Sequence, residues 1–150
     1  MSDGGNDGDA FRLVLATEFS YAHSFGELAP FFRGLEEGRL LATRCRVCGK
    51  AFCPPRLLCL CGASAYEWFE TNGAGAVRQV TTTAVGTRSL GVDQDAVFGL
   101  IAIDGCSNLL FARLAATDEP YRAGARVQLL APSGPLTHPI QQALFQAELG

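Results

Sequence analysis

Cysteine spacing limits what this chain can fold into more than any other feature of its sequence. Five of the six cysteines lie within residues 44–62, R-C-R-V-C-G-K-A-F-C-P-P-R-L-L-C-L-C-G. Two residues separate Cys45 from Cys48, one residue separates Cys59 from Cys61, and a glycine follows each pair. Thiolates on two such turns are able to converge on one tetrahedral Zn²⁺. Glycine suits the sharp reversal after each pair because it tolerates a positive φ. The spacing therefore predicts a zinc ribbon.

The second cysteine pair departs from the usual ribbon pattern, because it is C-x-C where C-x2-C is expected. Cys53 is therefore an alternative ligand, and one of the five cysteines is spare. We favour the two glycine-terminated pairs, since Cys53 precedes Pro54 and Pro55 and lies outside both turns. The competing interpretation, a disulfide or simple buried thiols, fits less well with metal-like spacing and a chain that shows no export signal.

Size and composition indicate a small globular protein. The chain has 150 residues, of which 48% are hydrophobic and 18% are charged, which suits one domain or two very small ones. A module of fewer than about 40 residues usually needs a metal or a disulfide, so the ribbon is expected to fold with its zinc. The net charge of -3 argues against general nucleic-acid binding.

The basic residues are unevenly distributed. No acidic residue lies between Glu37 and Glu67, whereas five of the twelve basic residues do. A Zn²⁺ with four thiolates carries a net negative charge, so part of this excess balances the metal site and the rest is free to face an anion.

The sequence offers no membrane span or export signal. No apolar run approaches the roughly 18 residues that a bilayer requires. The start, M-S-D-G-G-N-D-G-D, is acidic and glycine-rich, unlike a secretory or transit peptide. We therefore expect a cytoplasmic protein without a membrane partner.

The chain in order predicts a mainly β protein with a short N-terminal helix. We expect a flexible leader or partner-binding arm over residues 1–24, a helix and a rubredoxin-like zinc ribbon over 25–70, and a barrel over 71–150. Pro30 and Gly38 bound the helix expected over residues 26–38. The β-rich stretches of the second half are 76–85, 96–103, 108–114, 125–131 and the closing segment up to Leu149, which could also form a helix. Five strands of this length suit an OB-fold barrel.

The order of these parts resembles a known family. A helix with two phenylalanines and G-L-E-E-G-R-L precedes C-x2-C-G, P-P-R, a second Cys-Gly turn, E-W-F and a G-x-G entry into an all-β half. Over residues 26–131 the chain is similar to the zinc-ribbon plus OB-fold family of acyl-CoA-associated proteins, once catalogued as a domain of unknown function. It departs from that family in its shortened second cysteine pair and its long leader.

The resemblance implies an accessory subunit that binds Zn²⁺ and forms a hetero-oligomer with a thiolase-like or hydratase-like enzyme acting on CoA thioesters. The catalytic groups would then belong to the partner. Because CoA carries phosphates and an adenine, cations near a groove fit its charge and its ring. Our candidates for CoA binding are Lys50 and Arg56 on the ribbon and Arg88 and Arg113 on the barrel, each of which could equally be a solvated surface charge. The apolar run from Phe52 to Pro55 is expected to form a contact surface.

The residues themselves predict no catalytic site. Cys106 lies in a turn, and the two histidines, His23 and His138, stand in no recognisable constellation with it. Two other functions remain open on the sequence: a single-stranded nucleic-acid binder, since ribbons and OB barrels both serve that role, and an electron carrier with iron in the four-cysteine site.

Overall fold

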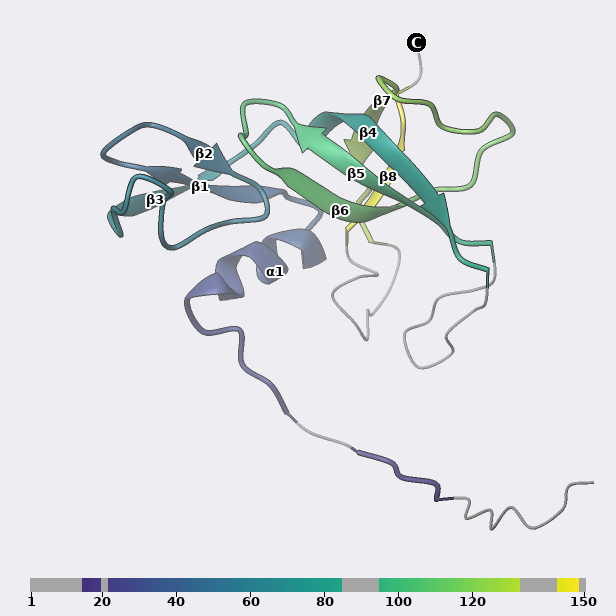
Figure 1. Cartoon of the computed structure of the whole chain (residues 1–150), viewed down its shortest axis with the longest axis horizontal. Helices are drawn as coiled ribbons and strands as arrows, with labels where there is room; N and C mark the ends of the chain where they lie inside the picture. Colours follow the sequence, from purple (N-terminus) through teal and green to yellow (C-terminus); the bar gives the residue numbers. More distant parts are fainter. Residues whose placement is uncertain (1–14, 20–21, 85–94, 133–142, 149–150) are drawn as a thin grey trace, which may run out of the picture.

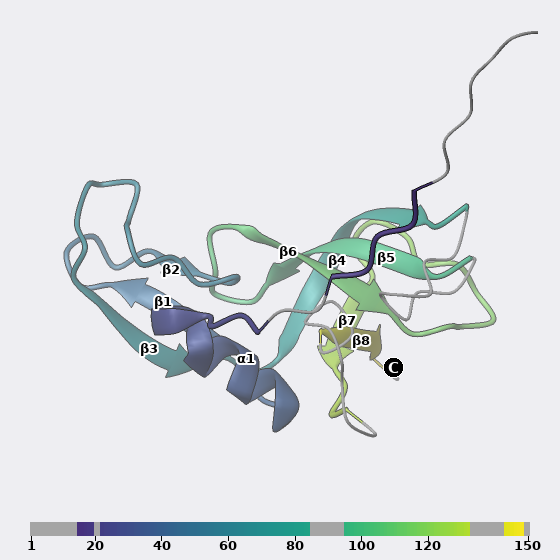
Figure 2. The same cartoon turned by 90° about the horizontal axis from the view of Figure 1, so that it is seen from below.

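The structure is a computed structural model that describes residues 15–19, 22–84, 95–132 and 143–148. A small sheet and a closed barrel lie side by side, with the helix packed beside the sheet (Figures 1 and 2). Residues 15–19 are exposed and lie away from the helix and from both β structures in Figure 1.

The predicted helix begins with a 3-10 turn, η1 (Gly26–Leu28), and continues as α1 (Ala29–Glu36) with a proline in its first turn. It ends in a Schellman motif, because Gly38 N–H donates to Leu35 O and Arg39 N–H donates to Gly34 O. Gly38 has a φ of +72°, and a Cβ there would lie 2.9 Å from Ala131 Cβ. The glycine thus both ends the helix and lets it approach the barrel closely.

The ribbon is a three-stranded antiparallel sheet in the order β2-β1-β3. Its strands are β1 (Leu41–Cys45), β2 (Ala51–Phe52) and β3 (Tyr66–Glu70). β1 leads into the first cysteine turn, as predicted, and β3 comes from the weakly alternating segment that follows the second turn.

The second half forms a closed five-stranded barrel in the order β4-β5-β6-β8-β7. β6 and β8 pair in parallel, and the other pairs are antiparallel. This is the Greek-key barrel expected of an OB-fold. The strands are β4 (Ala74–Thr82), β5 (Val97–Ile103), β6 (Leu109–Leu114), β7 (Arg126–Leu129) and β8 (Leu144–Ala147). The closing segment is a strand and not the alternative helix, and it places Phe145 in the core with no exposed surface.

One hydrophobic cluster runs through the helix, the ribbon and the barrel. Helix and ribbon residues share this cluster with inward-facing residues of all five barrel strands or their ends. The ribbon is therefore packed on the barrel and does not hang from a linker. The fully or nearly buried members with less than 3% exposure are Leu35, Leu40, Ala42, Cys53, Val77, Ile101, Ile103, Ala112, Leu114, Val127 and Phe145.

The prediction that residues 52–55 form a contact surface was wrong for Phe52 and Cys53. Phe52 is 3% exposed and packs against Cys45 and Cys59 inside the ribbon, while Cys53 has no exposed surface and belongs to the shared core. The reason is tertiary: the β5–β6 turn lies over this segment, and Ser107 N–H donates to Ala51 O at 2.8 Å.

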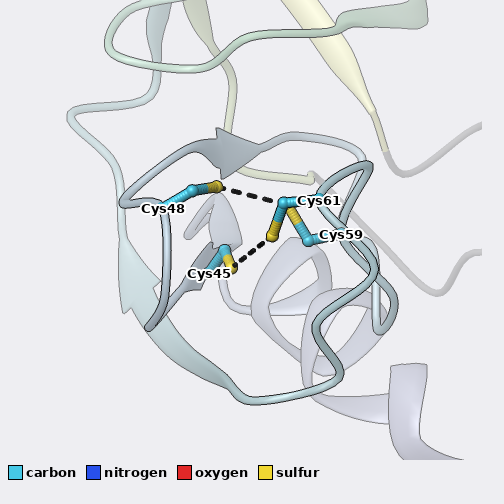
Figure 3. A group of neighbouring side chains, drawn as sticks. All are labelled: Cys45, Cys48, Cys59 and Cys61. Atoms are coloured by element: carbon cyan, nitrogen blue, oxygen red, sulfur yellow. Dashed lines mark hydrogen bonds between the residues drawn. The ribbon is translucent and has the colours of Figure 1, made fainter.

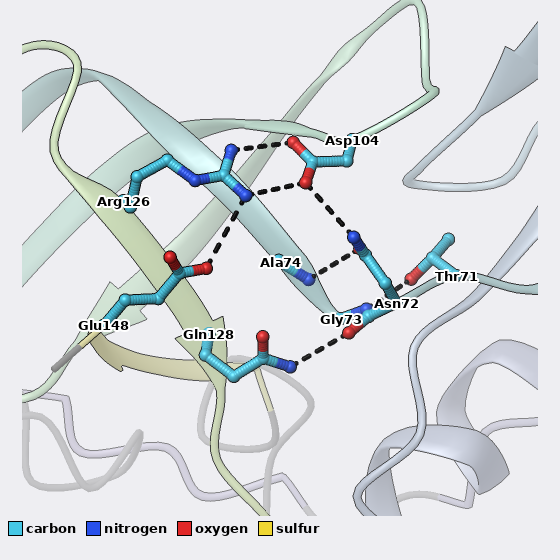
Figure 4. Close-up of polar contacts among 8 residues, drawn as sticks. All are labelled: Thr71, Asn72, Gly73, Ala74, Asp104, Arg126, Gln128 and Glu148. Carbon is cyan, nitrogen blue, oxygen red and sulfur yellow. Dashed lines mark hydrogen bonds and ion pairs between the residues drawn. The ribbon is translucent and has the colours of Figure 1, made fainter. Parts of the chain in front are cut away.

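A polar network ties together the ends of the barrel strands (Figure 4). The Arg126 guanidinium, at the start of β7, forms a two-pronged ion pair with the Asp104 carboxylate after β5, at 2.8 and 2.7 Å. Asn72 donates to the same carboxylate at 3.2 Å and accepts the Ala74 N–H at the start of β4. These bonds hold the pKa of Asp104 at about 2, chiefly through Arg126 and then Asn72. Glu148 adds a longer contact to Arg126 at 3.5 Å.

Within the described ranges, no helix is long and apolar enough to cross a membrane.

Candidate metal centre

Two tight turns at one end of the ribbon present the four predicted ligands. In the first turn Gly49 N–H donates to Cys45 O, and in the second Gly62 N–H donates to Cys59 O, both at 2.9 Å. Gly49 and Gly62 have φ values of +75° and +86°, as the sequence predicts for residues that reverse the chain. The shortened C-x-C pair still forms a complete turn.

The four sulfur atoms face one another (Figure 3). The Sγ atoms of Cys45, Cys48, Cys59 and Cys61 all lie within 4.8 Å of one another. Cys45 Sγ is 3.7 Å from Cys61 Sγ, and Cys48 Sγ is 3.4 Å from Cys59 Sγ. A tetrahedral ion with Zn–S bonds of about 2.3 Å has sulfurs about 3.8 Å apart. A disulfide would need an S–S distance of about 2.05 Å, and all four cysteines are free. The donor set and its spacing therefore fit Zn²⁺.

The electrostatics of the first turn favour a thiolate. Backbone N–H groups of Cys48 and then Val47 are directed at the Cys45 sulfur and lower the pKa of its thiol to about 6. This environment favours the anionic form of the buried sulfur, which is the form that binds a metal. Because four protein thiolates fill a tetrahedral site, the ion would be held as a structural tie, with no open position for a substrate.

A buried hydroxyl positions the loop between the two cysteine pairs. Thr43, on β1, has no exposed surface. Its Oγ1 donates to Arg56 O and accepts the Arg56 N–H, both at 2.9 Å. The loop that carries Cys59 and Cys61 is thus anchored to the central strand of the ribbon.

The spare cysteines lie elsewhere. Cys53 is outside the four-sulfur group, in the shared core, where burial strongly raises the pKa of its thiol. Cys106 lies in the β5–β6 turn, and burial raises the pKa of its thiol as well. Both are therefore protonated at neutral pH, which makes them poor nucleophiles and poor ligands.

Asn108, at the end of the β5–β6 turn, joins the barrel to the ribbon beside the metal site. Its Oδ1 accepts the Cys53 N–H at 2.7 Å, and its Nδ2 donates to Pro54 O at 2.9 Å. Both backbone groups lie in the segment between β2 and the second cysteine pair. The amide therefore connects the metal-carrying loop to the barrel.

The basic residues of the ribbon have different surroundings. Arg39 is paired with Glu37 and Glu70, and Arg46 lies 3.7 Å from Glu67. The guanidinium of Arg44 lies 4.6 Å from the centre of the Phe69 ring.

The candidates for CoA binding are spread over both β structures. Lys50 and Arg56 are exposed on the ribbon, and Arg56 lies 5.7 Å from the Phe52 ring centre. Arg113 is half-buried on β6. Arg88, like His138, lies outside the described residues, while His23 is exposed and packs edge-on against Phe25. The structure therefore brings the four predicted metal ligands together, whereas the described CoA-binding candidates lie on the ribbon (Lys50 and Arg56) and on β6 (Arg113).

Three polar residues escaped the sequence analysis: Thr43, Asn108 and the partner of Arg126, Asp104. Each acts across a turn or between sheets, so no local pattern marks it. The sequence holds only a weak signal for Asn108. The segment D-G-C-S-N is longer than a two-residue hairpin turn, and a turn of this length can contact a neighbouring part of the protein.

Comparison with known proteins agrees with this geometry. Residues 32–67 match the family model of the ChsH2 rubredoxin-like zinc ribbon domain. No curated protein matches the sequence significantly.

Two solved structures share the fold. One is a chain of the Ltp2-ChsH2(DUF35) aldolase, with a TM-score of 0.63 and 18% identity, covering 85% of this chain and 98% of that one. The other is a protein of unknown function from the DUF35 family of Sulfolobus solfataricus, with a TM-score of 0.59 and 20% identity, covering 82% of this chain and 87% of that one. The resemblance predicted from the sequence is thus confirmed in the ribbon and in the fold. The chain has the zinc-ribbon-plus-barrel fold of the DUF35 family, with a ribbon of the ChsH2 class.

Proposed function

We propose that this chain is a non-catalytic, zinc-binding subunit that docks on a catalytic enzyme acting on CoA thioesters and helps to hold the thioester. The partner we favour is thiolase-like, with a hydratase-like enzyme as the alternative. The observation that carries the proposal is the closed four-thiolate site, which lies on a ribbon that shares one hydrophobic core with the barrel. Such a site stabilises a rigid body and leaves no coordination position for chemistry.

The fold neighbour supports a catalytic partner, since the matched ChsH2(DUF35) chain belongs to an aldolase assembly with Ltp2. The cations supply a second line of support. Lys50 and Arg113 form no ion pair with any residue of the described ranges, so both are free to meet the phosphates of CoA. We extend this role to Arg56 and Arg88.

The ends of the cysteine turns are the docking surface that we propose. Val47, Leu58 and Leu60 are 71%, 61% and 74% exposed, and Val47 and Leu60 each lie between two ligand cysteines. Apolar side chains on turns that a bound metal would fix fit a protein partner, because their burial is favourable and little of the chain has to become ordered on binding.

Co-purification tests this function. The tagged chain is expressed with an untagged thiolase-like enzyme of the same organism, and we expect a hetero-oligomer whose activity on a CoA thioester requires both chains. Leu60→Glu should dissociate the complex while zinc is retained, and Leu60→Met should preserve it. A partner that is fully active alone, or turnover of the thioester by this chain unaided, would refute the proposal.

A further inference from the structure

The outer face of the barrel carries an apolar pocket that the metal centre does not use. It has a volume of about 210 Å³ and lies over β4, β5 and β6. Phe98, Leu100 and Phe111 line it from β5 and β6, and Gln79, Val80 and Thr81 line it from β4. Pockets that bind drug-sized ligands have volumes of about 300–1,000 Å³. The pocket is therefore sized for one ring system and not for a whole cofactor.

Two stacked phenylalanines form one wall. The rings of Phe98 and Phe111 are 5.3 Å apart and nearly parallel, with an angle of 7° between their planes. Phe98 is 3% exposed yet stands outside the barrel core, while Phe111 is 49% exposed. On β6 the core positions are Leu110, Ala112 and Leu114, so strand alternation directs Phe111 outward. A buried ring thus supports an outer ring that is half open to solvent.

A cation and two polar side chains lie beside this aromatic pair. Arg113 is directly opposite Phe98 in the β5–β6 register, and alternation puts it on the same face as Phe111. Thr81 is opposite Phe98 and Gln79 is opposite Leu100 in the β4–β5 register. Arg113 forms no ion pair or side-chain hydrogen bond with any residue that the structure describes. The face therefore combines a flat apolar surface, hydrogen-bonding groups and an unpaired positive charge.

We propose that this pocket binds the purine base of a phosphate-bearing nucleotide, in the first place the adenine of CoA, with the base stacked on Phe111 and a phosphate near Arg113. β5 and β6 are the second and third strands of the barrel, the face that OB barrels use for ligands. Aromatic side chains on this face stack with bases of any sequence, and arginine adds attraction for the phosphate. The inference rests on the proposed role in holding a CoA thioester and specifies where its nucleotide end is held.

Calorimetric titration of the full, zinc-loaded chain tests the pocket. We expect CoA to bind and pantetheine 4′-phosphate, which lacks the base, not to bind. Phe111→Ala should weaken CoA binding by about 5- to 150-fold, the range for loss of one base–aromatic stack. Phe111→Trp should preserve it, and Phe111→Leu, which is apolar but not flat, should not. Leu109→Ala is the matched control, because Leu109 is 42% exposed on the same strand but does not line the pocket.

Arg113→Gln should weaken CoA binding and reduce its dependence on salt, since one cation–phosphate contact is lost.

A single-stranded oligo-dA probe distinguishes CoA from nucleic acid as the source of the base. If oligo-dA binds more tightly than CoA and Phe111→Ala abolishes both, the base-binding pocket stands and CoA is wrong as its occupant. Pantetheine 4′-phosphate binding as well as CoA, no binding by any probe, or equal effects of Phe111→Ala and Leu109→Ala would each overturn the pocket.

Complex formation separates this inference from the proposed function. Phe111→Ala should still co-elute with the catalytic partner, because the docking residues lie on the ribbon. If the complex forms normally but the wild-type chain fails the CoA-binding tests above, the pocket proposal is refuted and the proposed subunit role is unaffected.

Discussion

A single hydroxyl group sets the position of the loop that brings the second cysteine pair to the first. Thr43 is fully buried, and its hydroxyl satisfies both backbone groups of Arg56. An unsatisfied buried N–H or C=O is costly, so the hydroxyl matters more than its size indicates. The lone buried polar residue among the described core residues thus lies on the strand that leads to Cys45.

Replacing Thr43 with valine keeps the volume and removes both hydrogen bonds. We expect Thr43→Val to lower the free energy of unfolding by about 1–3 kcal/mol and to speed zinc transfer to a chelator, because the loop is released. Hydrogen exchange of the Arg56 amide measures the loss directly. Thr43→Ser keeps the hydroxyl and should keep the amide protected; equal protection in the two variants would show that the hydroxyl does not anchor the loop.

At the scale of elements, the β5–β6 turn is the joint between barrel and ribbon. Asn108 bonds to Cys53 and Pro54, and Ser107 N–H bonds to Ala51 O, so three hydrogen bonds cross from the turn to the ribbon. Beneath them the hydrophobic core is continuous. The joint and the core together explain how a ribbon with little core of its own keeps a fixed place on the barrel.

Asn108→Ala removes two of these three bonds. We expect a loss of about 1–2 kcal/mol in the free energy of unfolding and faster hydrogen exchange of the Cys53 amide, with unchanged zinc content. Ser107→Ala is the control, since only the backbone of Ser107 makes the crossing bond and alanine retains it. If the hydrogen-exchange rate of the Cys53 amide rises no more in Asn108→Ala than in Ser107→Ala, the Asn108 bonds do not hold the ribbon on the barrel.

The Asp104–Arg126 pair makes barrel stability depend on acidity. The folded pKa of Asp104 is about 2, below the roughly 3.9 of an unfolded chain. The pair therefore stabilises the fold above pH about 4, and this stabilisation is lost as the pH falls from about 4 to about 2. Since both side chains are more than a third exposed, the effect is at most about 1 kcal/mol.

Chemical denaturation across this range compares the wild type with Asp104→Asn. The variant should be less stable above pH 5, and the difference should shrink as the pH falls toward 2. A difference that is the same at pH 2 and pH 6 would show that the charge of Asp104 is not its cause.

Local features of the fold were predictable from the sequence, and long-range ones were not. The four predicted metal ligands lie within one short segment, so their spacing alone predicted the group that the structure brings together. The strands followed from β-branched and alternating residues, and Gly38 marked the helix end. The burial of Cys53 was missed because it depends on Asn108, 55 residues further along the chain. Phe111 was assigned to a strand, but its outward direction required the register with β5.

At the scale of the whole molecule, a metal-stabilised ribbon and a closed barrel form one body. The ribbon sheet and the helix contribute to the same core as the barrel strands. The docking residues that we propose on the cysteine turns and the aromatic pocket on the barrel are thereby held in a fixed relation. This rigidity suits the role that we propose, a subunit that presents a ligand to another chain's active site. We expect it to depend on the metal that orders the ribbon.

Metal analysis of the intact chain, by native mass spectrometry with elemental quantification, tests this dependence most directly. The account predicts one zinc per chain in the wild type and in Cys53→Ala, and its loss in Cys59→Ser together with exposure of Trp68, which packs against the shared core. A chain that holds iron, that holds no metal, or that keeps its zinc after Cys59→Ser would contradict it.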